Sequence, residues 1–381
     1  MRILRSPQFS AIALVVAAIV GLVVANGPLS PAVSGFFDSH PGSLIPGLDL
    51  SIGHWVTDGL LAIFFFLAAI ELKHELRHGE LNSAAKALVP ATAAVGGVIV
   101  PAAIFLLLVP QAGLSDGWPI PTATDIAFAL GVLALTGRAL PTRVRALLLA
   151  LAVIDDLIAI VIIAFFFTSD LQPLALLGAV PVILVFGLLS YRLRGRRRIP
   201  VAVAMVVLAI VAWALVAVSG IHPTIAGVAL GLILSSRTGT TVRHAIEPFS
   251  NTIILPVFAF VATLVIIPDL SVTPLGPVFW AIVVALPVGK IVGITGGGLV
   301  ARSLSSGDRV PFADLLVVAS LGGIGFTVSL LMNELAFEAA PDVATEGTMG
   351  VLVASLIAVI VGGGVAALRS RQYARKSLPD A

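Results

Sequence analysis

Three carboxylates and one ammonium group lie in stretches of this sequence that are otherwise almost without charge. They are Asp155 and Asp156 in LLLALAVIDDLIAIVIIAFFF (147–167), Asp125 in WPIPTATDIAFALGVLAL (118–135) and Lys290 in VVALPVGKIVGITGGG (283–298). An ionised side chain at the centre of a membrane helix costs roughly 2.5–3.5 kcal/mol, so the four together would cost on the order of 10 kcal/mol. Because three carboxylates outnumber one ammonium, the excess predicts an acidic site that a metal cation, protons or both must neutralise.

The two adjacent aspartates should differ in role. Consecutive residues of an α-helix project about 100° apart, so one aspartate can pair with Lys290 on another helix while the other faces a cavity. A lysine suits such a pair because a desolvated ammonium can release its proton, whereas a guanidinium effectively cannot. Protons and cations would then compete for the same oxygens, which is the basis of an exchanger. The alternatives are a structural Asp–Lys clamp between helices and a lysine that snorkels to the membrane interface.

The composition places these charges in a membrane protein. Hydrophobic residues make up 59% of the 381 residues and charged residues only 11%, with a mean hydropathy of +1.11, which leaves too little polar surface for a water-soluble globule of this size. The formal net charge is +2, and the basic residues form short clusters between apolar runs, so nucleic acid is not an expected partner. The absence of cysteine excludes disulfides and thiolate metal sites. We expect no resident cofactor.

At about 20 apolar residues per span, the sequence predicts an all-α polytopic fold with about twelve transmembrane helices. The expected spans are 8–27, 54–76, 87–109, 117–137, 143–168, 173–191, 199–219, 222–236, 249–268, 276–301, 312–337 and 346–369. The first span is long enough to cross the bilayer and no clear cleavage site follows it, so we take it as a helix and not as a signal peptide.

Basic residues fix the expected orientation. Of the 22 Lys and Arg residues, 21 fall on one side of a twelve-helix alternation, and Lys290 is the exception. The clusters are Arg2 and Arg5; Lys73, Arg77 and Lys86; Arg138, Arg143 and Arg145; Arg192, Arg194 and Arg196–Arg198; Arg237 and Arg243; Arg302 and Arg309; and Arg369, Arg371, Arg375 and Lys376. The positive-inside rule makes this side cytoplasmic, with both termini inside.

Two of the predicted spans contain features that weaken a helix. Pro119 and Pro121, with Thr122 and Thr124 competing for backbone bonds, favour an interruption around 121–126. In SLGGIGFTVSLLM (320–332), three glycines would weaken the helix in the middle of its span. Glycines in membrane helices can also serve as close-packing surfaces, so both interpretations stay open. The two weakened spans are helices 4 and 11, which are the middle members of the triplets 3–5 and 10–12. Such paired breaks indicate inverted-topology repeats with a site at the midplane of the membrane. We expect one transporter domain over 1–381, with its core at about 87–168 and 276–369.

These segments also carry a family resemblance. GWPIPTATDIAFALGVLAL, LAVIDDLIAIVIIAFF, the Gly-Lys at 289–290 and GGIGFTVSLL are similar to the signature segments of the NhaA family of bacterial sodium/proton antiporters, a known example of inverted-repeat transporters. The resemblance implies electrogenic export of sodium or lithium in exchange for protons by alternating access. It further implies that Asp125 and Asp156, with Thr124 beside them, bind the cation, and that Asp155 pairs with Lys290 and exchanges protons. Helices 4 and 11 would cross as broken chains, with Asp125 compensating their positive ends and Lys290 their negative ends.

Other matches to the family are weaker. Asp58, Glu71 and Glu75 correspond to positions at the outer side and in the cytoplasmic funnel, but single helix-end charges in contact with water would look the same. His222 also matches, although a loop-end histidine without a ligand role is the simpler interpretation. The family has several acids and histidines before helix 9 that are linked to pH sensing, whereas TTVRHAIEPFS (240–250) offers only His244 and Glu247 for this role. In helix 9, FAFVATL (258–264) stands where the family usually has Asn-Ala-Gly. SLIPGLDLSIG (43–53) could form the family's external hairpin and hold a homodimer.

Two other functions fit parts of the pattern. A sodium-coupled organic-solute symporter needs a cavity with amides and hydroxyls, whereas the predicted site offers few beyond Thr122, Thr124 and Ser329. An intramembrane aspartyl protease needs two aspartates on separate helices, but its usual Gly-x-Gly-Asp context is absent here. The favoured expectation is therefore a transporter and not an enzyme. We expect it in the lipid bilayer of the bacterial inner membrane, serving sodium and pH homeostasis.

Overall fold

The computed structural model describes residues 6–42, 49–79, 81–168, 171–192, 198–267, 275–304 and 310–376, and helices are the only regular elements within these ranges. Ten helices are long and apolar enough to cross a membrane, and a bent pair could make an eleventh span. The predicted polytopic, all-α class is therefore confirmed, while the count of twelve stays a prediction. Residues 43–48 of the expected hairpin, and Arg2, Arg5, Arg194, Arg196, Arg197 and Arg309 of the orientation argument, lie outside the described residues.

The chain divides into two compact units. The first comprises Met1–Val16, Glu75–Ala159 and Val265–Ala381, and the second comprises Ala17–His74 and Ile160–Leu264. Three helices continue from one unit into the other, namely α1 (Pro7–Ala25), α4 (Leu61–His78) and α7 (Thr142–Phe166). Asp125, Asp155, Asp156 and Lys290 all belong to the first unit.

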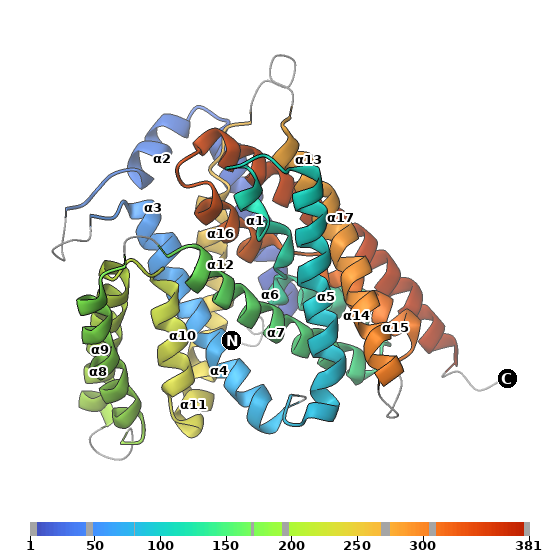
Figure 1. Ribbon diagram of the computed structural model, residues 1–381, viewed down its shortest axis with the longest axis horizontal. Coiled ribbons are helices and arrows are strands. Elements are labelled where there is room, and N and C mark those ends of the chain that lie inside the picture. The colour runs from blue at the N-terminus through green and yellow to red at the C-terminus, as the bar shows by residue number, and fades with distance from the viewer. Residues whose placement is uncertain are drawn as a thin grey trace. The chain divides into compact units, whose positions relative to one another are not determined.

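Within the first unit, α5 (Ala84–Leu108) packs closely along α14 (Lys290–Leu304), as Figure 1 shows. Glycines allow this approach. A β-carbon added at Gly293 would overlap the carbonyl oxygen of Gly96, and one at Gly297 would overlap the carbonyl oxygen of Thr92. Small residues spaced four apart let membrane helices approach backbone to backbone. The sequence GKIVGITGG (289–297) therefore places Lys290 at a close helix contact.

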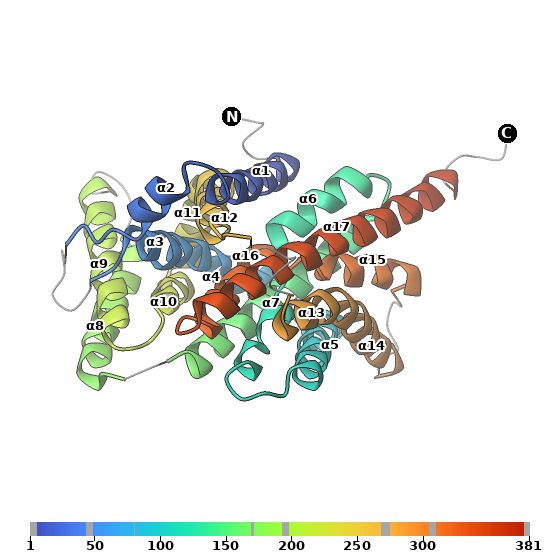
Figure 2. The same cartoon turned by 90° about the horizontal axis from the view of Figure 1, so that it is seen from above.

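Each of the two predicted weak points includes three residues outside the helices, 123–125 and 323–325. The short 3₁₀ turns η3 (Ser115–Gly117) and η4 (Ile120–Thr122) precede three residues without regular structure, and α6 begins at Ile126 and ends at Thr136. Farther along, α15 (Phe312–Gly322) and α16 (Phe326–Ala336) are separated by three residues and bent by 46°. The long α17 (Pro341–Lys376) runs beside α13 (Pro277–Val284) and α15 (Figure 2). A π-helical segment, η7 (Ala285–Gly289), joins α13 to α14.

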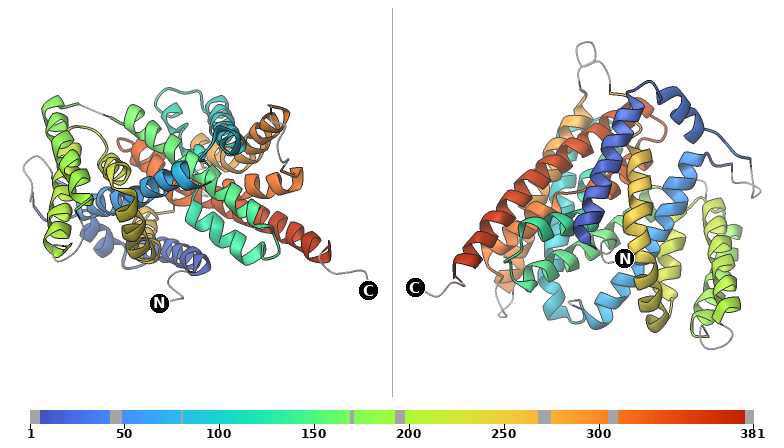
Figure 3. Two further views of the ribbon diagram at one scale, coloured as in Figure 1. Left: turned by 90° about the horizontal axis from the view of Figure 1, so that it is seen from below. Right: turned by 180° about the vertical axis from the view of Figure 1, so that it is seen from behind.

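The second unit contains α2 (Ser30–Phe37), α3 (Ile52–His54), the π-helical η2 (Trp55–Leu60), α8 (Pro173–Ser190), α9 (Arg198–Val218), α10 (Thr224–Ile233), α11 (Ser236–Phe249), the π-helical η6 (Ser250–Ile254) and α12 (Leu255–Ala262). Helices α8 and α9 pack side by side, in light green in Figure 3. Apolar clusters around Trp213 and Ala226, and around Phe186 and Leu230, fill this unit.

Two elements of the second unit differ from the prediction. The expected span 222–236 contains only the ten-residue α10, too short to cross a membrane alone. The span expected from 249 instead belongs to a helix that begins at Ser236. Its first part is polar, and the part-buried Arg243–Glu247 pair is spaced four residues apart, which stabilises a helical turn. Hydropathy alone missed this segment because its helix carries a polar face.

Candidate functional site

Lys290 and Asp155 form a buried ion pair. The side chains of both residues are completely buried, and the Lys290 ammonium donates a hydrogen bond to Asp155 Oδ2. The π-helical turn η7 precedes Lys290 directly, and Gly289 beside it packs against the Pro101 backbone of α5. A π-helical turn often re-aims side chains at functional sites. Separation from water makes the pair dependent on each partner, because removing either would leave a buried, uncompensated charge.

Thr124 links this ion pair to the broken helix α15–α16. Its hydroxyl lies 2.6 Å from Asp155 Oδ2 and 2.7 Å from the carbonyl oxygen of Gly322, the last residue of α15. A hydroxyl carries one proton, so it donates to one of these acceptors at a time. The other carboxylate oxygen, Asp155 Oδ1, is buried and has no hydrogen-bond partner in the described part of the chain. A buried oxygen of this kind is suited to take a proton or a cation.

Asp125 caps two helices at once. Its Oδ1 accepts a hydrogen bond from the Phe128 backbone N–H at 2.9 Å, as the N-cap of α6. Its Oδ2 accepts from the Thr327 hydroxyl at 2.6 Å and from the Thr327 backbone N–H at 3.3 Å, in the first turn of α16. The Asp125 N–H donates to the Ile324 carbonyl oxygen at 2.6 Å. One carboxylate thus accepts hydrogen bonds at the starts of both half-helices, where the helix dipole favours negative charge.

Asp156 is buried, with 5% of its surface exposed, one residue from the ion pair. Among the described residues, no three His, Asp or Glu side chains gather as a metal-binding group. Asp125, Asp155 and Asp156 therefore do not form a closed coordination sphere in this structure. The structure joins Asp155, Lys290 and Thr124, and it attaches Asp125 to the half-helix ends.

Two site-forming residues were not singled out from the sequence. Thr327 supplies two donors to Asp125, and Ser355 of α17 accepts a hydrogen bond from the Phe326 backbone N–H at 3.1 Å. Phe326 is the one non-glycine residue of the described chain with a positive φ, at 20°. The sequence FTVS (326–329) after the glycines could have indicated a role for Thr327, because a hydroxyl in the first turn of a helix commonly forms hydrogen bonds near that end. Nothing in the sequence pointed to Ser355.

Two of the accessory acids, Glu71 and Glu247, contact the same arginine. In the second unit, the Arg243 side chain contacts both Glu71, at 3.2 Å, and Glu247, at 3.3 Å, so these two predicted positions meet through one arginine. His244 is exposed. In the first unit, the Glu75 side chain is buried and its carboxylate folds back over Gly79.

Asp58 lies in η2 and meets His222. The distance from His222 Nε2 to Asp58 Oδ1 is 3.4 Å, and the Trp213 indole N–H donates to the Asp58 carbonyl oxygen at 3.2 Å. The simpler interpretation of His222 as a loop-end residue did not foresee this partner. A sequence separation of 164 residues (222 − 58) explains why no local pattern could indicate the contact.

The chain is similar in sequence to known proteins over nearly its whole length. A family model described as Na+/H+ antiporter 1 matches residues 1–366. The chain is 52% identical over 380 residues to Na(+)/H(+) antiporter NhaA 2 of Clavibacter michiganensis subsp. michiganensis, covering 98% of this chain and 93% of the relative. It is 45% identical over 369 residues to Na(+)/H(+) antiporter NhaA of Tropheryma whipplei (95% and 94%). It is also 44% identical over 388 residues to a protein of the same name from Streptomyces avermitilis (97% and 82%).

Proposed function

The chain belongs to the NhaA family of sodium/proton antiporters, and we propose that it exports sodium or lithium in exchange for external protons by electrogenic alternating access. Sodium/proton exchange is the function that the names of its relatives print. They support neither the organic-solute symporter nor the aspartyl protease. The protein is a transporter and not an enzyme, and sodium and protons are its substrates.

We assign cation binding to Asp125 and Asp156, with Thr124 beside them, and proton exchange to the Asp155–Lys290 pair. The observation that carries this assignment is the environment of Asp155. One of its buried oxygens is shared by Lys290 and Thr124, and the other has no partner within the described ranges. A proton on that carboxylate would weaken its hold on the ammonium, so protonation and opening of the pair are coupled.

The exchange follows from charge compensation. The proposed site has three buried aspartates and one buried lysine, so it carries excess negative charge whenever all four groups are ionised. A sodium ion or a proton can each neutralise one negative charge of the site, and both bind to the same carboxylate oxygens. Each ion therefore leaves as the other arrives. Glu71, Glu75 and Asp58 serve as accessory charges along the approach, and His244 and Glu247 as pH-responsive groups.

We further propose a location and an assembly. The polytopic helices belong in the bacterial plasma membrane, and the one-sided distribution of basic residues supports two cytoplasmic termini. A homodimer through residues 43–53 is our assembly proposal, in line with the family resemblance.

Everted vesicles that contain this protein test the assignment. With an imposed pH gradient, adding sodium should dissipate the gradient in the wild type. Asp125→Asn and Asp156→Asn should abolish this response, because an amide cannot release a proton or carry the charge that holds sodium. Asp342→Asn, at an exposed position in the first turn of α17, is the matched control and should exchange ions normally.

Normal exchange by both site variants would show that the assignment is wrong. A second measurement tests the exchange itself. Purified protein titrated with sodium in weak buffer should release protons, and sodium binding without proton release at every pH would rule out antiport through shared oxygens.

A further inference from the structure

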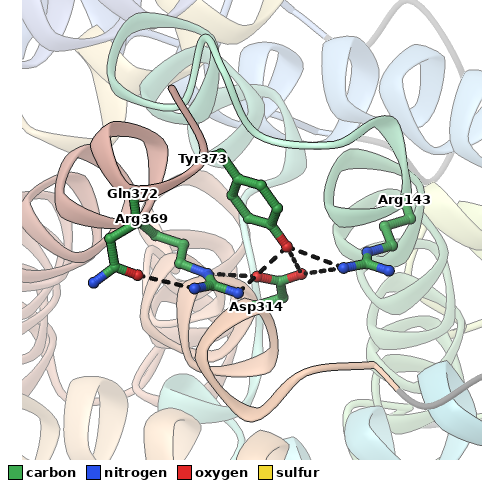
Figure 4. A network of polar contacts seen from close by, with 5 residues as sticks. All are labelled: Arg143, Asp314, Arg369, Gln372 and Tyr373. Carbon is green, nitrogen blue, oxygen red and sulfur yellow. Dashed lines mark hydrogen bonds and ion pairs between the residues drawn. The ribbon is translucent and has the colours of Figure 1, made fainter. Parts of the chain in front are cut away.

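A buried carboxylate lies at the opposite end of α15 from the ion site. Asp314 is the third residue of α15, and its side chain is completely buried. Arg369 Nε of α17 donates to Asp314 Oδ1 at 2.7 Å, and Arg143 Nη2 of α7 donates to Asp314 Oδ2 at 3.0 Å (Figure 4). Asp314 therefore joins three helices through two ion pairs.

Tyr373 completes this group of contacts. Its hydroxyl donates to Asp314 Oδ2 at 2.8 Å and lies 3.0 Å from Arg143 Nη2 and 3.3 Å from Arg369 Nη2. The Arg369 guanidinium also stacks over the Tyr373 ring, 4.6 Å from its centroid. Gln372 Oε1 accepts from Arg369 Nη1 at 2.9 Å. We call these five residues, Arg143, Asp314, Arg369, Gln372 and Tyr373, the Asp314 network; Figure 4 shows them.

The charges of the Asp314 network are unequal in their importance. Arg143 belongs to α7, Arg369 to α17, and Asp314 is the single acid that both arginines share. Loss of one arginine would leave the other ion pair in place. Loss of the Asp314 charge would release both pairs and leave two guanidinium groups beside each other, one of them largely buried. Asp314 is therefore the residue on which the connection depends.

Helix geometry connects this network to the ion site. Asp314 and Gly322 are eight residues apart on α15, about 12 Å along the axis, and Arg143 and Asp155 are twelve residues apart on α7, about 18 Å. Away from the Asp314 network, the Thr124 hydroxyl lies between the Gly322 carbonyl oxygen at the end of α15 and Asp155 in the middle of α7. Helices α7 and α15 are therefore linked at two places, by Arg143–Asp314 and through Thr124. A stiff half-helix held at its start cannot slide freely at its end.

We propose that Asp314 is a positioning residue for ion exchange. By anchoring the start of α15 to α7 and α17, it sets where the Gly322 and Ile324 carbonyl groups lie relative to Asp155, Thr124 and Asp125. Preorganised ligands bind an ion more tightly than ligands that must first be ordered. This inference rests on the proposed function for its transport consequence, but its structural consequence is independent of that function.

The transport test compares Asp314→Asn with the wild type in proteoliposomes. The apparent KM for sodium should rise about fivefold or more while the maximal rate stays within about twofold, because the ligands remain but are less ordered. The pH profile should shift with the KM. Arg143→Gln should raise the KM less, and the double variant Asp314→Asn/Arg143→Gln should resemble Asp314→Asn, since the shared contact is already lost. Arg143→Lys should recover part of the change.

The structural test uses hydrogen–deuterium exchange of the purified protein without sodium. In Asp314→Asn, amide exchange should increase at residues 322–327 and 124–128 as well as at the start of α15. Arg145→Gln on α7 and Arg371→Gln on α17 remove exposed charges near the network and serve as controls, and they should change neither exchange nor KM.

An unchanged KM and pH profile in folded Asp314→Asn would overturn the proposal, as would faster exchange confined to the start of α15. Should Asp314→Asn fail to fold, Arg143→Gln decides, because Arg143 is half exposed and its loss leaves the Arg369 pair intact. A wild type without sodium-dependent proton flux would refute the proposed function, while the hydrogen-exchange result would still decide on Asp314.

Discussion

At the scale of single residues, Asp125 caps two half-helices and is, in our proposal, also a ligand of the transported cation. Its two oxygens receive hydrogen bonds from Phe128 and Thr327, which stabilise its ionised form at the start of two half-helices. The same oxygens are proposed to bind the transported cation. We therefore expect the hydroxyl of Thr327 to influence cation binding through its hydrogen bond to Asp125.

Thr327→Val should weaken sodium binding. The substitution keeps the shape of the side chain but removes a hydroxyl that donates to a buried carboxylate, a bond typically worth about 1.5–3 kcal/mol. The apparent KM for sodium should therefore rise by about tenfold or more. Thr327→Ser restores the hydroxyl and should recover most of the affinity. Equal KM values for the valine and serine variants would show that the hydroxyl has no such role.

At the scale of elements, the close contact of α5 with α14 positions Lys290. The backbone of Gly293 lies against that of Gly96, so the two helices meet without intervening side chains. One turn earlier, Gly289 and the π-helical η7 bring Lys290 toward Asp155. The placement of the ammonium thus depends on residues that carry no charge.

Gly293→Ala should destabilise the protein and impair exchange. The added methyl group would overlap the Gly96 carbonyl oxygen, and overpacking of this kind typically costs about 1–3 kcal/mol. Gly296→Ala, three residues along the same helix, meets nothing within 4 Å and is the matched control. Gly293→Ala should show a lower melting temperature in detergent and a lower sodium-dependent proton flux than Gly296→Ala. Identical melting temperatures would contradict the packing argument.

At the scale of the whole molecule, the proposed site lies within a single compact unit. Asp125, Asp155, Asp156 and Lys290 all belong to the first unit, whereas the Asp58–His222 and Glu71–Arg243–Glu247 groups belong to the second. Of the proposed accessory charges, Glu75 alone shares the first unit with the proposed ion site. Competition between protons and sodium should be a property of the first unit.

The pH dependence of sodium affinity follows from this competition. Carboxylates bind sodium only when ionised, so lowering the pH protonates them and raises the apparent KM for sodium. In the acidic range, the KM should rise by up to about tenfold per pH unit for each proton released, and it should level off at high pH. Initial rates across sodium concentrations at several pH values test this. A KM that does not change with pH would refute competition.

The sequence alone determined the class of protein and singled out four charged residues that the structure buries. Uncompensated charge in apolar segments is expensive wherever the segments lie, so Asp125, Asp155, Asp156 and Lys290 could be recognised before any contact was known. Helix-weakening residues near 121–126 and 322–325 likewise act locally, which is why they could be located. Helix boundaries at 236–262 could not, because a polar helical face carries no hydropathy signal.

The tertiary structure alone decided the partners. Thr124 with Gly322, Asp125 with Thr327, His222 with Asp58, and Asp314 with Arg143 and Arg369 join residues that are mostly far apart in the chain. Which side chain meets which depends on how rigid helices pack, and packing is set by many small contacts such as Gly96 against Gly293. The cost of a buried charge can be read from its own segment, but the group that compensates it is known only once the chain has folded.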